Sequence, residues 1–410
     1  MKEFDKPVRQ PAWRRAVVSS GLAGPVAGMN GSEGQQAAAT WRGVPEPVTV
    51  RWHQPEGLYG LSLLNALLTF LTLGLYLPWA KTEVRRRLWR AVEINGQRLE
   101  YTGQGLQLFL GLLIVGSVLV LLTGLYYAVG FYLLLPADRN ITDQDVEEVS
   151  TLLGLFLLPI VAFLWGVARH RALRYRLRHT LWRGIRGGMA GSALRHGWRH
   201  LWTYLPVFLS LGLLVPWRAV HLRNALFSDM RFGSGRFLCR AQWLRLMPAW
   251  LMVWGSAALL VLYGLAHAYM IAVAADPYVH NAVFMAASLW LISLPGWVPW
   301  ALFGVAVYAF LRYEAGKLNA IARGMRFREV QFSLDMTVDS LLRMLLRNAL
   351  LLFVSFGLFR PVVLANIAGH LVGHLKVHGA LDVASLTQAA EEGEERAGEG
   401  LASFLDIDGV

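Results

Sequence analysis

Uncharged apolar stretches alternate with short, strongly basic segments along most of the chain. Four stretches reach or exceed the roughly 20 helical residues needed to cross about 30 Å of hydrocarbon. They lie at residues 105–135, 149–168, 246–275 and 279–311. Three shorter apolar units occupy residues 58–80, 201–217 and 348–360. The pattern predicts an all-α integral membrane protein, a helical bundle with four long transmembrane helices and three short apolar helices.

The apolar pattern is duplicated in tandem. Residues 164–168 read Leu-Trp-Gly-Val-Ala and residues 302–306 read Leu-Phe-Gly-Val-Ala, an offset of 302 − 164 = 138 residues. The first two short units keep this offset, and the third repeats their pattern again. We therefore divide the chain into five parts. These are a disordered cytoplasmic tail (1–50), membrane repeat 1 (51–200), membrane repeat 2 (201–340), a partial third repeat (341–383) and an acidic C-terminal tail (384–410).

Each short unit carries the motif (Ser/Thr)-(Leu/Phe)-Gly-Leu-x-x-Pro. Its hydroxyl, glycine and proline are Thr72, Gly74 and Pro78, then Ser210, Gly212 and Pro216, then Ser355, Gly357 and Pro361. Glycine permits a positive φ, proline ends a helical ladder, and the hydroxyl can satisfy a carbonyl that proline leaves without its donor. We predict re-entrant, half-crossing or interfacial helices with the motif near the turn, since a full crossing would place basic flanks on opposite faces. The first unit is long enough to span, so a full crossing is the alternative.

Turn signals with β-prone flanks follow each short unit. They are Asn95-Gly96, Gly233-Ser234-Gly235, and Gly379 within residues 375–380. Asn-Gly and Gly-rich turns between alternating apolar residues are typical of β-hairpins. We therefore predict small cytoplasmic β-hairpins at one end of an otherwise helical protein.

Composition and charge agree with a membrane location. Hydrophobic residues make up 55% of the 410 residues and charged residues 16%, against about 25% charged in an ordinary soluble domain. Basic residues lie between the apolar stretches, whereas residues 136–148 are acidic, so the positive-inside rule predicts a multi-pass protein with both termini in the cytoplasm. We interpret the net charge of +12 as serving topology and anionic lipid head groups on the cytoplasmic face, and we expect no nucleic-acid partner.

Candidate chemistry is sparse. His370, His374 and His378 share one helical face at a metal-compatible spacing, but no cysteine or carboxylate accompanies them. We assign these three to a membrane-edge or core role. Another set lies among arginines and is interpreted as lipid-facing or in loops: His170, His179, His196 and His200.

One ionisable residue lies within a short apolar unit. Arg360 is a functional candidate for that reason, with snorkelling of its side chain to the head groups as the alternative. No serine, histidine and carboxylate occur together as a triad would require, and the long apolar stretches contain no carboxylate. We predict that the protein is not an enzyme, with no catalytic, cofactor or metal site.

The first short unit and the segments after it form a more specific pattern. It reads Asn65-x-x-Leu68-Thr69-x-x-Thr72-Leu73-Gly74-Leu75-Tyr76-x-Pro78-Trp79-Ala80-Lys81, followed by Gly96-x-x-Leu99-Glu100-Tyr101 and Trp182-Arg183-Gly184-Ile185-Arg186. These residues resemble the YjgN-like family of bacterial inner-membrane proteins, a domain of unknown function. The resemblance covers about residues 50–410. It implies a bacterial inner-membrane protein with no established activity, cofactor or substrate.

Two functions fit these observations best. In a transporter or channel for a small solute, the short units meet centrally and a polar pathway is lined by Thr69, Thr72, Ser210 and Ser355. In a membrane scaffold or anionic-lipid-binding protein, nothing is moved. We favour transport and keep the scaffold as the alternative. Transport requires the motif turns to converge on a polar cavity, whereas a scaffold would have separate units around an apolar interior.

Overall fold

The computed structural model describes residues 46–134, 143–274, 296–382 and 386. Most of the two predicted tails, residues 135–142, and residues 275–295, which include the first part of the fourth apolar stretch, lie outside the described residues. The chain divides into two compact units. The larger comprises residues 47–381 and 387–410, and the smaller comprises residues 1–46 and 382–386. The helices, and the strands from β2 onward, belong to the larger unit.

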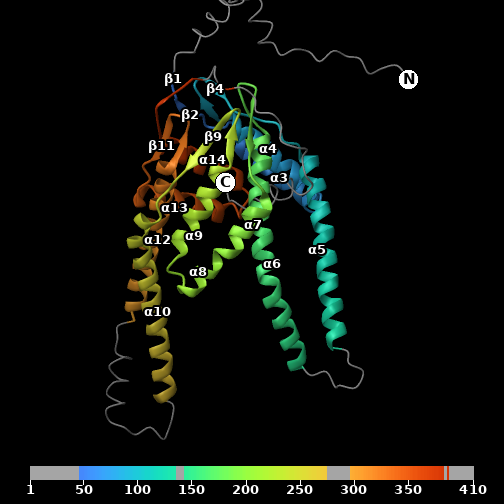
Figure 1. Ribbon diagram of the computed structural model, residues 1–410, viewed down its shortest axis with the longest axis vertical. Coiled ribbons are helices and arrows are strands. Elements are labelled where there is room, and N and C mark those ends of the chain that lie inside the picture. Colours follow the sequence, from blue (N-terminus) through green and yellow to red (C-terminus); the bar gives the residue numbers. More distant parts are fainter. Residues whose placement is uncertain (1–45, 135–142, 275–295, 383–385, 387–410) are drawn as a thin grey trace, which may run out of the picture. The chain divides into compact units, whose positions relative to one another are not determined.

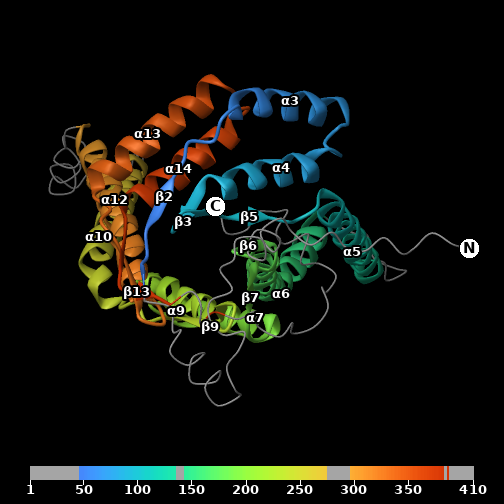
Figure 2. The same ribbon diagram turned by 90° about the horizontal axis from the view of Figure 1, so that it is seen from above.

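Each short apolar unit folds as helices on the two sides of a tight turn, with one helix before the turn in the first and third units and two in the second (Figures 1 and 2). The helices are α3 (Leu58–Leu71) and α4 (Leu77–Arg90), then α7 (Ala193–Trp202), α8 (Tyr204–Leu209) and α9 (Val215–Ser228), then α13 (Val338–Val354) and α14 (Arg360–His374). The motif proline always lies in the first turn of the helix that follows the tight turn, α4, α9 or α14. Its missing N–H breaks no helical hydrogen bond there.

The long helices extend away from the strands in Figure 1. They are α5 (Gly105–Leu134), α6 (Asp143–Arg178), α10 (Met247–Ala274), preceded by the 3-10 turn η1 (Leu244–Leu246), and α12 (Val298–Gly324). Among the described residues, one helical stretch, Leu244–Tyr269, is long and apolar enough to cross a membrane. The prediction of four long transmembrane helices is therefore wrong. In α6 and α12 the apolar stretch shares its helix with an arginine-containing end, and part of the fourth stretch is not described.

The prediction of an all-α fold is also wrong, because eight antiparallel strands pair in the order β12-β11-β10-β9-β8-β7-β6-β5. These strands are β5 (Glu100–Tyr101), β6 (Thr180–Trp182), β7 (Ile185–Met189), β8 (Met230–Phe232), β9 (Gly235–Cys239), β10 (Met325–Phe327), β11 (Val330–Leu334) and β12 (Leu375–His378). A second sheet contains β2 (Val50–Trp52), β3 (Val92–Ile94) and β4 (Gln97–Arg98). The two-residue strands β1 (Glu46–Pro47) and β13 (Ala380–Leu381) complete the set in the described residues.

Two of the three predicted hairpins form. Asn95-Gly96 connects β3 to β4 with φ values of 47° and 74°, and Gly233-Ser234 connects β8 to β9. The third is wrong, because β12 pairs with β11. Hairpins of successive repeats also join edge to edge, for example through β7 and β8. An open strand edge leaves N–H and C=O groups unpaired, so edge-to-edge pairing turns separate hairpins into one sheet.

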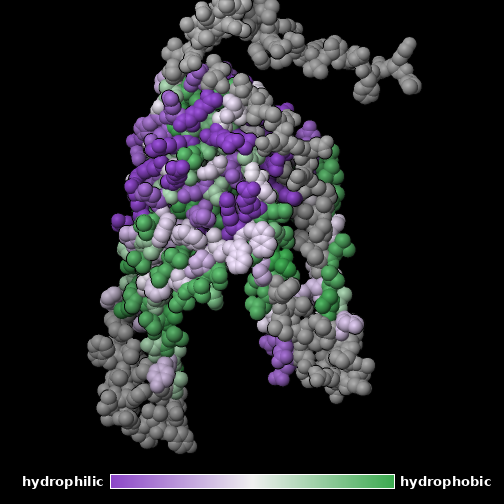
Figure 3. Space-filling model, in the orientation of Figure 1, coloured by the Kyte–Doolittle hydropathy of each residue, from purple (hydrophilic) through white to green (hydrophobic). Residues whose placement is uncertain are grey.

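Apolar and polar residues separate along the molecule. Hydrophilic side chains gather near the strands in Figure 3, and hydrophobic ones cover the parts of α5, α10 and α8 that extend from that region. A buried apolar cluster that includes Val220, Cys239, Leu246 and Tyr313 packs α9, β9 and α12 together. This cluster fixes the position of the second helix–turn–helix, where the candidate site lies.

Candidate functional site

The three motif turns share one backbone geometry. Leu73 and Gly74 have φ values of 51° and 92°, and the Gly74 N–H donates to the Thr69 carbonyl at 2.7 Å. The other turns are Leu211-Gly212, with φ values of 50° and 88°, and Phe356-Gly357, with 49° and 82°. The glycine N–H of these turns donates five residues back in the same way, at 2.8 Å in both. The motif therefore specifies a left-handed turn that reverses the helix direction.

The motif hydroxyl bridges the two sides of each turn. The Thr72 hydroxyl donates to the Leu68 carbonyl at 2.7 Å and accepts from the Tyr76 N–H at 3.0 Å. The equivalent N–H to hydroxyl distances are 3.1 Å at Ser210 and 3.3 Å at Ser355. Each hydroxyl thus satisfies a backbone donor at the start of the second helix, besides the carbonyl contact expected from the sequence.

The turn tips point outward and are apolar. Leu73, Leu211 and Phe356 are 94%, 78% and 95% exposed. Arg360 is exposed at the start of α14, next to Pro361, and Pro78 and Pro216 are fully buried. In the described part of the chain, two pockets near the second unit, one basic and one apolar, contain none of the motif hydroxyls or glycines. The three turns are therefore alike, and neither of these pockets is a cavity that the turns share.

Gly212→Ala is expected to lower stability by about 1–2 kcal/mol, because an L-residue is strained at a φ of 88° although no atom lies within 4 Å of the added Cβ. Thermal melting of the detergent-solubilised protein measures the change. Gly255→Ala is the matched control, since this helical glycine also has open space around it. Equal melting temperatures for the two variants would show that the left-handed turn is not strained by a side chain.

A second candidate site lies at the second short apolar unit, which comprises α7, α8 and α9. It begins where α7 crosses α6 at glycines. A Cβ on Gly166 would lie 2.5 Å from the His200 Cβ and 3.0 Å from the Gly197 Cα. A Cβ on Gly197 would lie 2.9 Å from the Phe163 carbonyl oxygen. The absence of side chains at both positions permits this close approach of the two helices. It also brings the basic end of α6 against the histidines of α7.

Three histidines are buried at this crossing. His170 of α6 is 0% exposed, and His196 and His200 of α7 are each 2% exposed. His170 Nε2 lies 3.8 Å from Asp229 Oδ2, and neither of its ring nitrogens makes a hydrogen bond of standard geometry. The assignment of these three residues to loops or lipid-facing positions is therefore wrong.

His200 has a defined role among the three. Its Nδ1 donates to the Ala162 carbonyl at 2.9 Å, which leaves Nε2 to accept from the Arg218 guanidinium at 3.2 Å. Arg218 also lies over the Tyr204 ring, with Cζ 3.7 Å from the ring centre. By contrast, His196 Nδ1 is buried without a hydrogen-bond partner.

Burial and neighbouring cations keep these histidines neutral. Burial, together with Arg174 and Arg171, lowers the pKa of His170 to about 4. Burial and the neighbouring His170 and Arg169 lower the pKa of His196 to about 3. Burial and Arg218 lower the pKa of His200 to about 4. All three are thus uncharged at neutral pH and can act as hydrogen-bonding groups without adding charge.

A basic pocket of about 280 Å³ opens beside this cluster. We call it the basic pocket and define it by its charged or polar lining residues Arg169, His196, Arg218, Arg223, Glu314 and Lys317. Burial lowers the pKa of Arg218 and of Lys317, and Lys317 pairs with Glu314. Four cations therefore face a pocket with one carboxylate, an arrangement that concentrates positive potential.

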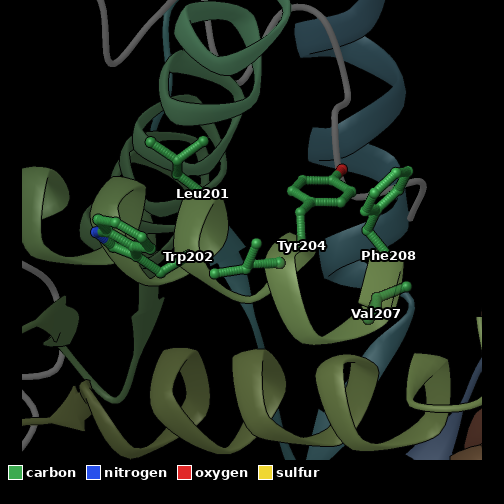
Figure 4. A pocket seen from close by; sticks show the side chains of 6 residues that line it. Leu201, Trp202, Tyr204, Val207 and Phe208 are labelled. Carbon is green, nitrogen blue, oxygen red and sulfur yellow. The ribbon is translucent and has the colours of Figure 1, made fainter. Parts of the chain in front are cut away.

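An apolar pocket of about 590 Å³ lies on α7 and α8 (Figure 4). Its lining consists of Leu201, Trp202, Tyr204, Leu205, Val207 and Phe208. Tyr204 connects the two pockets, because it lines the apolar pocket and its ring lies against Arg218 of the basic pocket. The indole N–H of Trp250, another basic-pocket residue, donates to the Gly212 carbonyl at 3.0 Å, which joins the basic pocket to the second turn.

The basic pocket was not predicted from the sequence, although an alignment of the three short units contains a signal for it. His196 corresponds to Leu58 and Leu341, and Arg218 corresponds to Ala80 and Val363, counted from the motif glycine. All four of these counterparts are buried apolar residues. Polar residues at two positions that are apolar in both other copies mark the second unit as different.

Comparison with known families fits these features of the sequence. Residues 54–404 match the family described as Bacterial protein of unknown function (DUF898). The chain belongs to this DUF898 family. The resemblance to YjgN-like proteins is thereby confirmed, since curated relatives carry that name. No solved structure matches the chain.

The curated relatives match only in part. The Inner membrane protein YjgN of Escherichia coli (strain K12) is 32% identical over 119 residues, which is 29% of this chain and 26% of that protein. The protein of the same name from Salmonella typhimurium is 40% identical over 55 residues, 13% of this chain and 14% of that protein. The aligned part of this DUF898 chain thus spans about a quarter or less of these relatives.

Proposed function

We propose that this protein resides in the bacterial inner membrane and anchors there through the apolar tips of its helix–turn–helix units, with its basic side toward anionic lipid head groups. The observation that carries the proposal is the exposure of large apolar side chains at all three turns. Beside Leu73, Leu211 and Phe356, two more exposed apolar residues flank each turn: Phe70 and Leu71, Phe208 and Leu209, and Phe353 and Val354. The name of the curated relatives, Inner membrane protein YjgN, supports the location.

Transfer of these side chains from water to lipid supports the proposal in energetic terms. Full burial of one leucine or phenylalanine contributes about 1.5–3 kcal/mol, so three apolar residues per tip favour insertion strongly. Soluble proteins rarely expose contiguous apolar patches of this kind. Three tips of the same geometry, each with an aromatic residue, are better explained by a common hydrocarbon environment than by three unrelated partners.

We favour anchoring and lipid binding over solute transport, and we assign no enzymatic activity. A polar pathway would need the motif hydroxyls to face a shared cavity. In the described residues these hydroxyls instead bond to their own turn backbones, and the tips beside them are apolar. Cationic side chains near the strands suit the anionic head groups at the membrane surface, because each contributes about 1 kcal/mol of attraction there.

Environment-sensitive labels test the anchoring. In a Cys239→Ala background, Leu73→Cys, Leu211→Cys and Phe356→Cys would each carry a nitrobenzoxadiazole label in proteoliposomes. We expect blue-shifted emission that nitroxide-labelled acyl chains quench and aqueous iodide does not. Ser234→Cys, in the exposed β8–β9 turn, is the control and should show the reverse. Iodide quenching at all three tips would overturn the proposal, because it would place the turns in water or in an aqueous pathway.

A further inference from the structure

The basic pocket combines features that a packed helical interior does not need. It is lined by four cationic side chains, those of Arg169, Arg218, Arg223 and Lys317, and by one carboxylate, Glu314, which pairs with Lys317. Cationic side chains that converge on one pocket attract an anion into it. Residues of the second unit, α6 and α12 therefore form a pocket lined by four cations and one carboxylate.

One residue of the pocket lining also has a buried polar atom that makes no hydrogen bond. His196 lines the basic pocket, is 2% exposed, and its Nδ1 makes no hydrogen bond. Leaving a buried polar atom unsatisfied costs about 1–3 kcal/mol. The counterparts of His196 and Arg218 in the other units are buried apolar residues, which shows that the fold itself packs well without them. The polar residues at these positions thus point to a ligand and not to a packing requirement.

The neighbouring apolar pocket extends this site in a second direction. Tyr204 forms one wall of the apolar pocket and packs its ring against the Arg218 guanidinium. An anionic group held by Arg218 would therefore lie next to a surface formed by Trp202, Leu205 and Phe208. Such a pair of pockets fits a molecule with a compact anion at one end and a hydrocarbon chain at the other.

We propose that the basic pocket binds a phosphate group, carried by a phospholipid whose acyl chain lies on the apolar pocket. Arginine donors and a neutral histidine are suited to phosphate oxygens. This inference deepens the proposed lipid-binding role by naming its site. It does not depend on the turn tips lying in a bilayer, so it can be tested in detergent micelles where anchoring plays no part.

Calorimetric titration of the full-length protein in maltoside detergent is the test, with three probes: inorganic phosphate, glycerol 3-phosphate and dihexanoyl phosphatidic acid. We expect saturable binding at one site, with the lipid at least about tenfold tighter than glycerol 3-phosphate because its chains bury apolar surface. Equal affinity for the lipid and glycerol 3-phosphate would show that the acyl chains do not contribute. The pocket would then be a site for a soluble phosphate compound and not for a phospholipid. No saturable binding of any probe would overturn the inference.

Variants locate the site. Arg218→Gln and Arg223→Gln should each weaken binding by about tenfold or more, because each removes a charge-assisted hydrogen bond. Arg236→Gln removes the same charge from an exposed position on β9 and should change affinity less than about twofold. Equal losses for Arg236→Gln and Arg218→Gln would overturn the inference in favour of unspecific electrostatics.

A variant that fills the pocket without changing its charge tests the site even if the charge variants fail to fold. Ala219 lines the basic pocket, and Ala219→Phe would fill it while leaving every charge in place. We expect loss of phosphate and lipid binding with a melting transition like that of the unmodified protein. Undiminished binding in a folded Ala219→Phe protein would show that the anion does not enter this pocket.

Discussion

Gly166→Ala is expected to destabilise the protein by about 3 kcal/mol or more. Its new Cβ would lie 2.5 Å from the His200 Cβ and 3.0 Å from the Gly197 Cα, too close for ordinary contact with a helix backbone. Helix α7 would have to move away from α6, and overpacking of this kind typically costs about 1–3 kcal/mol when flexible side chains can yield. Here the second contact is a backbone atom, so the strain is harder to relieve. Thermal melting in detergent measures the effect.

The duplicated sequence supplies an internal control. Gly304 occupies the same place in Leu302-Phe303-Gly304-Val305-Ala306 as Gly166 in its own copy, yet no atom lies within 4 Å of a Cβ built there. Gly304→Ala should therefore be neutral or raise stability by up to about 1 kcal/mol, since alanine is the better helix former. The same substitution at equivalent positions of the two copies would thus destabilise the protein in one copy and not in the other. Similar melting temperatures for the two variants would contradict the close crossing of α6 and α7.

The turns were predictable because their geometry is local. A hydroxyl residue, a positive-φ glycine and a proline within seven residues determine most of the backbone at Thr72, Gly74 and Pro78. The same applies to Asn95-Gly96, whose φ values suit a two-residue hairpin. Strand pairing between repeats was not predictable. Residues such as Gly188 and Arg231, which pair across β7 and β8, are far apart in sequence, and each hairpin alone gives no sign of what covers its edge.

The histidine cluster was misread for a related reason. His196 and His200 lie in a segment with Arg195 and Arg199, and neighbouring arginines normally indicate a solvated face. The i and i+4 spacing does place the two histidines on one side of α7. Which side is buried depends on the approach of α6 through Gly166, a contact between helices that periodicity within one helix does not report.

Differences between copies carry more functional information here than similarities. The motif turns are common to all three units, so they belong to the shared anchoring role that we propose. Arg218 and His196 occur in one unit only, where Ala80, Val363, Leu58 and Leu341 are the counterparts. A single specific site on a repeated framework explains why the anchoring elements are triplicated while the cationic pocket is not.

Acidification is expected to destabilise the protein strongly between about pH 6.5 and pH 4. Burial, with nearby cations, lowers the pKa of His170 and of His200 to about 4 and that of His196 to about 3, from 6.5 in the unfolded chain. Below pH 6.5 the unfolded chain therefore binds more protons than the folded one, so the free energy of unfolding falls as pH falls. The stabilisation is fully present above pH 6.5. Its loss across the cluster is on the order of several kcal/mol.

Other charges modify this loss without reversing its sign. Burial raises the pKa of Asp229, so the protonation of this one carboxyl favours the folded state and offsets part of the loss from the three histidines. Asp229 also attracts a protonated His170 at 3.8 Å, while Arg171 and Arg174 oppose that protonation. The melting temperature in detergent should accordingly be constant from pH 8 to 7 and fall steeply from pH 6.5 downward. A flat profile over this range would contradict the burial of neutral histidines.

His196→Leu separates this cluster from other acid-sensitive groups. Leucine occupies the equivalent buried position in both other units, at Leu58 and Leu341, so the substitution should be accommodated at neutral pH. It removes the group with the lowest pKa of the three. The decline in melting temperature below pH 6.5 should therefore become shallower than in the unmodified protein. His378→Leu, on an exposed strand residue, should leave the decline unchanged, because no buried neutral histidine is lost.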